Sequence, residues 1–127
     1  MIHLDTHVVV WLAGGRLSKL PAPARALIEA EPVAVSPMVE VELAVLSEIG
    51  RIGLGPIAIL DRLRQALGLI IDAPTFYVAA AVAATPAYAF ARDPFDRLIS
   101  AHAGGLGVPL ITADEKLRSN LDFCVWD

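Results

Sequence analysis

The sequence predicts an α/β domain in which helices cover both faces of a central parallel sheet. Short apolar runs alternate along the chain with longer segments of helical pattern. The runs are almost continuously hydrophobic, as in strands that are buried on both faces. Strands that alternate with helices pair in parallel, because each helix carries the chain back across the sheet.

Five short apolar runs are the expected strands. Four of them end at or near an aspartate or a Ser-Pro pair, which are residues typical of turns, and the fifth closes the chain. In chain order they are Met1–Leu4, Pro32–Val35, Leu67–Asp72, Val108–Thr112 and Phe123–Trp126.

Helical patterns lie between these runs, over Pro23–Ala30, Pro37–Ile49, Pro56–Leu67, Thr75–Ala84 and Pro94–Leu106. Ser36 and Asp93 each precede a proline and are typical helix caps. The glycine-rich segment Gly50–Gly55 lacks the lysine of a phosphate-binding loop, so we interpret it as a turn. Propensity alone predicts that His7–Ala13, with its three consecutive valines, continues the first strand.

Composition limits the function classes. The chain has 127 residues, which is the size of one domain, and 56% of them are hydrophobic. No apolar run is long enough to cross a bilayer, and an acid stands where a secretory signal would be basic. Cys124 is the only cysteine and has no internal disulfide partner, which is typical of a reducing compartment. We therefore expect a cytoplasmic protein without membrane contact.

Charge and hydropathy also indicate partners. The net charge is -4 and no basic stripe is present, which excludes nucleic-acid binding by charge alone. A nucleic-acid substrate would need another local source of positive charge, such as a metal ion. The apolar excess predicts that a partner or a second copy covers part of the surface.

Two aspartates stand at the start of the helix predicted over Pro94–Leu106. Asp93 is explained as the helix cap, and we assign it no catalytic role. Asp96 falls in the first turn, where the helix dipole stabilises an acid by about half a kcal/mol. Taken alone, Asp96 is explained by this dipole.

Glu42 is harder to explain as a surface acid. The residues three and four positions from it are all apolar, namely Met38, Val39, Val45 and Leu46. Burial of a lone carboxylate costs several kcal/mol unless it is paired or binds a metal ion. Glu40, two positions earlier, is expected to be an ordinary acid of the first turns.

Asp5 and Asp114 each follow an apolar strand. Each of them alone is explained as a cap of the next helix, but ligands of open parallel sheets bind beyond the carboxyl ends of the strands. Together with Glu42 and Asp96 they would form an acidic cluster at one edge of the sheet. Clustered carboxylates repel one another unless a cation joins them, and oxygen ligands suit Mg²⁺ or Mn²⁺. Such an ion activates water for phosphodiester cleavage.

Four segments in order carry a family resemblance. They are "LDTHVVVWL", "SPMVEVELAVL", "RDPFDRLISAHA" and "LITADEKL". They resemble the PIN domain, and more narrowly the VapC-type toxins of bacterial type II toxin–antitoxin pairs. Each segment is a weak signal, but four in order with fitting spacing form a strong one. The resemblance covers residues 1–127 as a single PIN domain. It implies a three-layer α/β/α sandwich with a central parallel sheet, in which His7–Ala13 is helical.

The same resemblance implies the site residues. The implied catalytic residues and ligands of Mg²⁺ or Mn²⁺ are Asp5, Glu42, Asp96 and Asp114. Thr6 and Thr112 are implied as supporting residues, with Thr112 close enough to help hold a ligand water. Glu115 stands beside Asp114, and we prefer Asp114 as the ligand because it lies nearer the strand end.

The implied activity is that of a metal-dependent endoribonuclease that cuts structured RNA such as tRNA. The implied partners are RNA and a cognate antitoxin protein that blocks the site. The chain alone is expected to form a homodimer. With the antitoxin, a heterotetramer or a larger assembly is expected.

Several other polar residues are candidates for weaker roles. Arg97 is expected to orient a carboxylate, to contact a phosphate or to pair with Asp93, and His7 is expected near Asp5. Arg92 and Lys116 would form a modest RNA-binding rim, although solvated surface charge is the default for each.

Histidine spacing does not predict zinc. His3, His7 and His102 form no pair with typical ligand spacing, and we expect His3 and His102 to be core or edge residues.

Other function classes remain open from the sequence. A phosphatase or a receiver-like phospho-aspartate domain also has an aspartate at the end of its first strand. A haloacid-dehalogenase-like phosphatase would need a second aspartate two positions later, where this chain has His7. A PIN-fold nuclease of RNA processing without a toxin role, or a non-catalytic antitoxin-binding module, would keep the same fold.

Overall fold

A computed structural model describes all 127 residues, and it contains the parallel sheet that the sequence predicts. The sheet has five strands in the order β3-β2-β1-β4-β5, and every neighbouring pair is parallel. The strands are β1 (Ile2–Leu4), β2 (Val33–Val35), β3 (Ile70–Ile71), β4 (Leu110–Ile111) and β5 (Cys124–Val125). The predicted α/β class is therefore confirmed, with strands shorter than the apolar runs.

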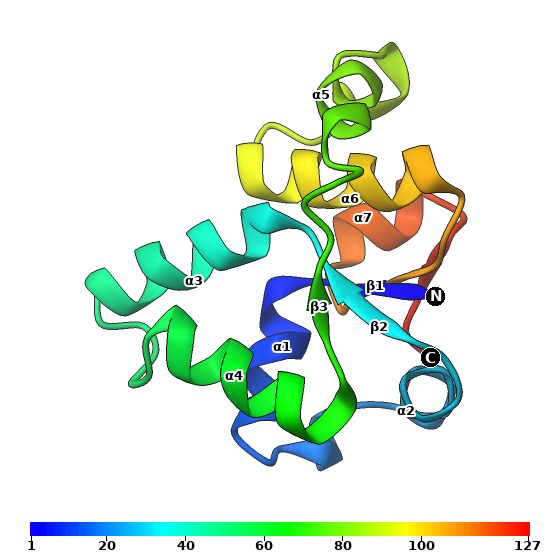
Figure 1. Ribbon diagram of the computed structural model, residues 1–127. Coiled ribbons are helices and arrows are strands. Elements are labelled where there is room, and N and C mark those ends of the chain that lie inside the picture. Colours follow the sequence, from blue (N-terminus) through cyan, green and yellow to red (C-terminus); the bar gives the residue numbers. More distant parts are fainter.

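Seven α-helices connect these strands, and they form two layers. The helices are α1 (Thr6–Ala13), α2 (Ala22–Ala30), α3 (Pro37–Glu48), α4 (Pro56–Leu67), α5 (Tyr77–Ala83), α6 (Pro94–Leu106) and α7 (Glu115–Asn120). Helices α5 and α6 lie on one side of the sheet, and α1, α2 and α4 lie on the other (Figure 1). Two short 3₁₀ turns, Leu17–Lys19 and Pro86–Tyr88, and helix α7 were not predicted.

Helix α1 overturns the strand that propensity predicts for His7–Ala13. The side chain of Asp5 caps this helix by accepting a hydrogen bond from the backbone N–H of Thr6. Val8 and Val9 are fully buried in the helix, so tertiary packing outweighs the strand preference of valine. The helical expectation that came from the family resemblance is confirmed.

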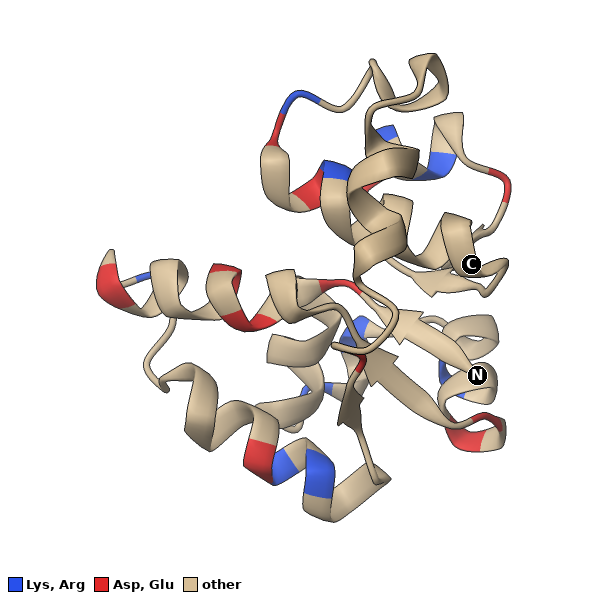
Figure 2. Ribbon diagram, turned by 45° about the horizontal axis from the view of Figure 1, so that its top comes forward, with Lys and Arg blue, Asp and Glu red and all other residues tan.

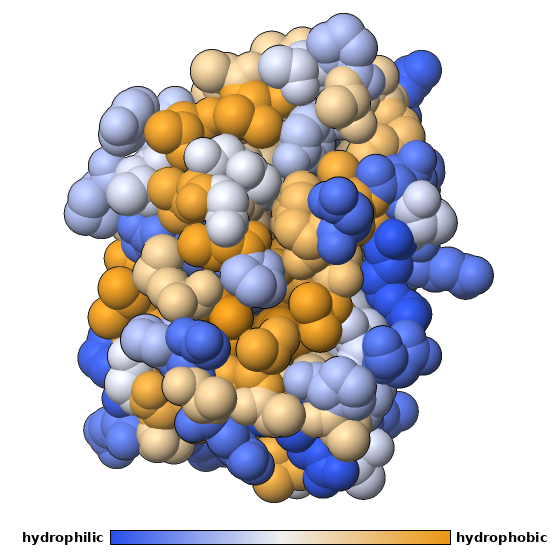
Figure 3. Space-filling model, turned by 90° about the vertical axis from the view of Figure 1, so that its right-hand side faces the viewer, coloured by the Kyte–Doolittle hydropathy of each residue, from blue (hydrophilic) through white to orange (hydrophobic).

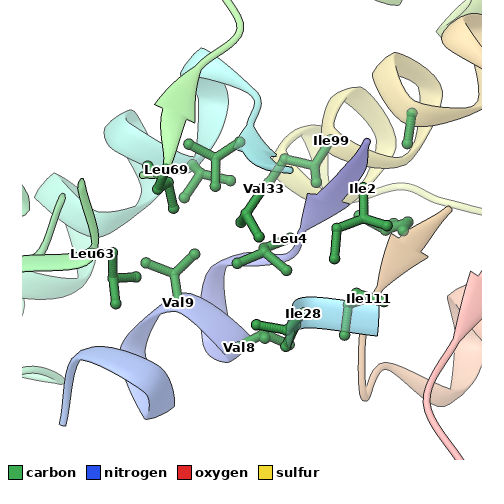
Figure 4. Packing of buried hydrophobic residues seen from close by; sticks show 14 of the residues in the cluster. Ile2, Leu4, Val8, Val9, Ile28, Val33, Leu63, Leu69, Ile99 and Ile111 are labelled. Atoms are coloured by element: carbon green, nitrogen blue, oxygen red, sulfur yellow. The ribbon is translucent and has the colours of Figure 1, made fainter. Parts of the chain in front are cut away.

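The core lies between the sheet and the layer of α1 and α4. Figure 4 shows Leu4, Val9 and Leu63 pointing toward one another from β1, α1 and α4, and none of the three is more than 2% exposed. Side chains alternate along a strand, so Ile2 and Leu4 face this core while His3 points to the opposite face, toward α6. Because of this alternation, His3, a polar residue of the central strand β1, lies between the sheet and α6.

Apolar residues also reach the surface. Figure 3 shows hydrophobic residues gathered across the face that carries both chain ends. Ile57 and Tyr77 are more than 70% exposed elsewhere on the molecule. No helix combines the length and the hydrophobicity that a membrane crossing requires.

Candidate functional site

A cavity of about 410 Å³ lies where the strands β1 and β4 end and the helices α3 and α6 begin. Its lining consists of Asp5, His7, Trp11, Glu42, Asp93, Asp96, Ala113 and Asp114. All four acids that the family resemblance implies therefore line one cavity. Figure 2 shows the acidic positions of α3 and of the head of α6 near the same end of the molecule. No lysine or arginine belongs to the lining.

Asp5 is buried and held by two hydrogen bonds. Its Oδ1 accepts from the backbone N–H of Thr6 at 2.8 Å, and its Oδ2 accepts from the hydroxyl of Thr112 at 2.6 Å. Burial raises the pKa of Asp5, while the hydrogen bonds from Thr112 and Thr6 act in the opposite direction. The carboxylate is thus fixed at the end of β1 by its own helix and by the neighbouring strand.

Glu42 is held by the other predicted supporting residue. The hydroxyl of Thr6 donates a short hydrogen bond to Oε1 of Glu42, which joins the start of α1 to α3. Burial raises the pKa of Glu42, and the charge of Asp5 adds to this effect. Glu40, on the same helix, is exposed in its first turn, as expected.

Asp96 has a strongly perturbed carboxyl group. Burial, followed by the negative charges of Asp5 and Asp93 and then of the other acids, raises the pKa of Asp96 to about 7. Like-charged groups in one cavity make each further negative charge more costly. A divalent cation in the cavity would offset that cost.

Asp114 begins helix α7 and lines the cavity. Its Oδ1 accepts from the backbone N–H of Leu117 at 2.8 Å, and its own N–H donates to the hydroxyl of Thr112 at 3.0 Å. Glu115 is exposed and lies outside the lining. The geometry therefore favours Asp114 over Glu115 as the acid that faces the cavity.

The sequence predicts Asp93 to be a helix cap without a catalytic role, and the structure confirms the cap. Its Oδ1 accepts from the backbone N–H groups of Phe95 and Asp96 at 2.8 and 3.2 Å. The residue nevertheless lines the acidic cavity as well. The only sequence signal that Asp93 would also line the cavity was its position directly before the "PFD" segment, which contains Asp96.

The four acids line the cavity, but no three of them bring their ligand atoms within 4.8 Å of one another. The group of three ligand-type residues whose donor atoms all lie within 4.8 Å of one another is elsewhere, and it contains none of these acids. Mg²⁺ keeps several of its waters when it binds proteins, so a ring of carboxylates around an open cavity fits a hydrated ion. The donors are all oxygen, which fits Mg²⁺ or Mn²⁺ better than a softer metal.

The guanidinium of Arg97 forms no ion pair with an acid of the cavity, so the expected pairing with Asp93 is absent, while contact with a phosphate stays a prediction. Its Nε donates to the backbone oxygen of Ala83 at 2.8 Å, and its Nη1 donates to that of Ala91 at 3.4 Å. The guanidinium therefore ties α6 to the end of α5, and no ion pair with Asp93 forms.

The other candidate residues divide into two groups. His7 lines the cavity and is exposed, so it stays a candidate for substrate contact. Arg92 and Lys116 are exposed and lie outside the lining. Trp11 also lines the cavity and packs on Trp126, with ring centroids 5.8 Å apart.

A second and larger cavity of about 480 Å³ adjoins the acidic one, and His7 and Trp11 line both. It lies along α1 and the start of α4, and its lining is mostly apolar, with Arg16 and Arg51 as its only charged residues apart from any charge on His7. It contains no carboxylate, so the acidic cavity is the candidate site for chemistry despite its smaller size.

A buried polar cluster was missed from the sequence. His3 and His102 are both fully buried, as expected for core residues, but they meet Asp72 in the layer beneath α6. Burial lowers the pKa of His3 and that of His102, the latter to about 4, so both rings are neutral at pH 7. Burial acts to raise the pKa of Asp72, but hydrogen bonds from Thr75 and His3 outweigh it and lower this pKa.

Comparison with known proteins agrees with this geometry. The chain is 35% identical over 119 residues to Ribonuclease VapC22 of Mycobacterium tuberculosis, which covers 92% of this chain and 89% of that protein. Its fold resembles the crystal structure of VapBC2 from Rickettsia felis bound to a promoter DNA fragment, with a TM-score of 0.62, 20% identity and full coverage of both chains. The PIN domain model matches residues 2–120. This chain therefore belongs to the PIN domain family and is a relative of VapC.

Proposed function

We propose that this protein is a Mg²⁺- or Mn²⁺-dependent endoribonuclease that acts as the toxin of a type II toxin–antitoxin pair. The observation that carries the proposal is the acidic cavity, in which Asp5, Glu42, Asp96 and Asp114 come together from four separate segments. A cavity with this charge and no lysine or arginine in its lining repels a polyanion such as RNA. A bound divalent cation reduces that repulsion and offers a ligand position to a phosphate oxygen.

The metal ion, when bound, supplies an activated water and stabilises the departing oxygen of a phosphodiester. The chain's own residues supply the frame for this chemistry. Thr112 and Thr6 orient the carboxylates of Asp5 and Glu42. Asp96 projects from the head of α6, and Asp114 from the head of α7. The ligands therefore sit on rigid elements, which limits the reorganisation needed when substrate binds.

A substrate of structured RNA, such as tRNA, is part of the proposal. The relative named Ribonuclease VapC22 supports a ribonuclease activity by its name. His7 lies at the rim of the acidic cavity and Trp11 in its wall, where they are placed to contact a nucleotide beside the reacting phosphate.

A cognate antitoxin and a homodimer complete the proposal. The similar fold in a VapBC complex supports a protein partner of the antitoxin class. The second cavity, which is mostly apolar and adjoins the acidic one through His7 and Trp11, supplies area for such a partner. An antitoxin bound there would keep RNA away from the acids.

The activity is tested by incubating structured RNA with the purified protein and Mg²⁺ or Mn²⁺, with EDTA as the metal-free control. Glu42→Gln and Glu40→Gln form a matched pair, because both acids stand on α3 and only Glu42 lines the cavity. We expect cleavage by the wild type and by Glu40→Gln, and at least about 100-fold less by Glu42→Gln or in EDTA. Cleavage that survives EDTA or Glu42→Gln would refute the metal-dependent mechanism.

The toxin role is tested separately by inducing the chain in bacteria. We expect growth arrest with the wild type and normal growth with Glu42→Gln. Normal growth in cells that contain folded, RNA-cleaving wild-type protein would favour the alternative, a PIN-fold nuclease of RNA processing. Folded protein with neither activity would favour a non-catalytic module that binds an antitoxin.

A further inference from the structure

The buried cluster of His3, Asp72 and His102 lies outside the acidic cavity and has no part in the proposed reaction. Its residues come from β1, from the segment after β3 and from α6. His3 stands two residues before Asp5, roughly 7 Å along the strand, and His102 stands six residues after Asp96, roughly 9 Å along the helix. The cluster therefore lies between the sheet and α6, farther from the carboxyl end of β1 than Asp5 is.

Three potential ligand atoms converge in this cluster. Nε2 of His3 lies 3.1 Å from Oδ2 of Asp72, and Nε2 of His102 lies 3.8 Å from the same oxygen. Ligand atoms of a tetrahedral zinc site, with bonds of about 2.0–2.2 Å, lie about 3.4 Å apart. Two of the three distances in the cluster are close to this value, and all three ligand atoms lie within 4.8 Å of one another.

A fourth donor is close by. The hydroxyl oxygen of Thr75 lies 2.8 Å from Nε2 of His102. Two imidazole nitrogens with one carboxylate and one water oxygen form a typical donor set for Zn²⁺, and the hydroxyl of Thr75 stands where it would replace or hold that water. Thr75 is only partly buried, and Ala73 and Pro74 before it are exposed, so this segment separates the cluster from solvent by a single layer.

The charge of Asp72 is not balanced by any lysine or arginine. The side chain is nearly buried, and the only basic groups within 4.0 Å of it are the two imidazoles, which are neutral at pH 7. Hydrogen bonds from Thr75 and His3 stabilise the carboxylate, as its lowered pKa shows, but they leave its charge in place. In addition, Nδ1 of each imidazole is buried without a hydrogen-bond partner. A cation held at the Nε2 side would supply the missing positive charge.

We propose that His3, Asp72 and His102 form a second metal site, which binds Zn²⁺ with Thr75 or a water as the fourth ligand. The site ties the central strand, the segment after edge strand β3 and helix α6 together, so the bound ion stabilises the fold. Neither Nδ1 has an acceptor that would strengthen its ring as a ligand. We therefore expect an affinity about 10- to 100-fold below that of zinc sites with such acceptors.

The test is zinc retention in the presence of excess Mg²⁺, which occupies the acidic cavity. Purified protein is loaded with Zn²⁺, dialysed against Mg²⁺ buffer and analysed for metal content. We expect a single zinc ion per chain in the wild type and in Asp96→Asn, and none in His102→Gln, whose amide retains a polar contact for Thr75. No zinc in the wild type, or equal zinc in His102→Gln, would overturn the proposal. Zinc that is lost in Asp96→Asn would place the ion in the acidic cavity instead.

A measurement on the unaltered chain covers the case in which His102→Gln does not fold. Zn²⁺ is titrated into wild-type protein with ¹⁵N-labelled histidine in Mg²⁺ buffer, and the ring nitrogens are followed by NMR. We expect the Nε2 signals of His3 and His102 to shift together while those of exposed His7 stay in place. A shift of His7 alone, or of none of the three, would contradict the second site.

Discussion

Thr112 donates its hydroxyl proton to the carboxylate of Asp5 at 2.6 Å, although the two residues are 107 positions apart in the sequence. The parallel pairing of β1 with β4 brings them together. The same hydroxyl accepts the backbone N–H of Asp114 at 3.0 Å. One buried side chain thereby fixes one candidate ligand and the backbone of another.

Replacing Thr112 with valine tests this relationship. The change keeps the side-chain shape but leaves Oδ2 of buried Asp5 and the N–H of Asp114 without their partner. We expect a loss of about 1–3 kcal/mol in the free energy of unfolding, measured with denaturant. Thr112→Ser keeps the hydroxyl and is expected to lose clearly less. A Thr112→Val variant as stable as the wild type would show that the hydroxyl contributes no stability. A larger loss in Thr112→Ser than in Thr112→Val would show that the methyl group matters more than the hydrogen bond.

Replacing Asp96 with asparagine is expected to stabilise the metal-free protein. Partial burial, followed by the negative charges of the other acids in the cavity, raises the pKa of Asp96 to about 7. In EDTA at pH 7 we expect Asp96→Asn to gain on the order of 1 kcal/mol in the free energy of unfolding. It should also lose most of the further stabilisation that Mn²⁺ gives the wild type. Glu115→Gln, an exposed acid outside the lining, is the matched control and should change neither quantity.

Arg97 is predicted to act in stability and not in RNA cleavage. Its guanidinium donates to the backbone oxygens of Ala83 and Ala91, which would lose these partners in Arg97→Met. We expect a loss of about 1–3 kcal/mol in the free energy of unfolding and unchanged RNA cleavage per folded molecule. Arg92→Met removes an exposed arginine and should leave stability unchanged. A large loss of cleavage in folded Arg97→Met would restore the substrate-binding role.

Cys124 is predicted to react slowly with alkylating reagents. Burial, followed by the charges of Asp5 and Asp114, raises the pKa of Cys124 to about 12, above its ordinary value of 9.0. Because the thiolate is disfavoured in the folded chain, the stability that this thiol contributes is complete below pH 9 and is lost as the pH rises toward 12. After allowance for the greater nucleophilicity of a more basic thiolate, we expect alkylation at pH 8 about 30-fold slower than in the unfolded chain. Equal rates would show that β5 does not shield this thiol.

The strand ends and the acids beyond them were predictable because they depend on short segments. An apolar run followed by Asp5 or Asp114 marks a strand and its turn without knowledge of the rest of the chain. Glu42 was recognisable because an acid on an apolar helix face needs a partner. The family resemblance then joined these local signals into one site, and the fold places all of them around one cavity.

The buried cluster and the role of Arg97 were not predictable, because they depend on contacts between distant segments. His3 and Asp72 are 69 positions apart, and Thr75 and His102 are 27 apart. No spacing rule relates such residues before the strand order is known. Helix α1 shows the same dependence, since Val8 and Val9 become helical through burial against a sheet that local propensity does not describe.

The central claim is that the four acids hold a divalent cation, and anomalous diffraction from crystals grown with Mn²⁺ tests it most directly. We expect an anomalous peak inside the cavity, within ligand distance, directly or through a water, of Asp5, Asp96 and at least one further acid. A map from well-ordered crystals with saturating Mn²⁺ and no peak in this cavity would contradict the account.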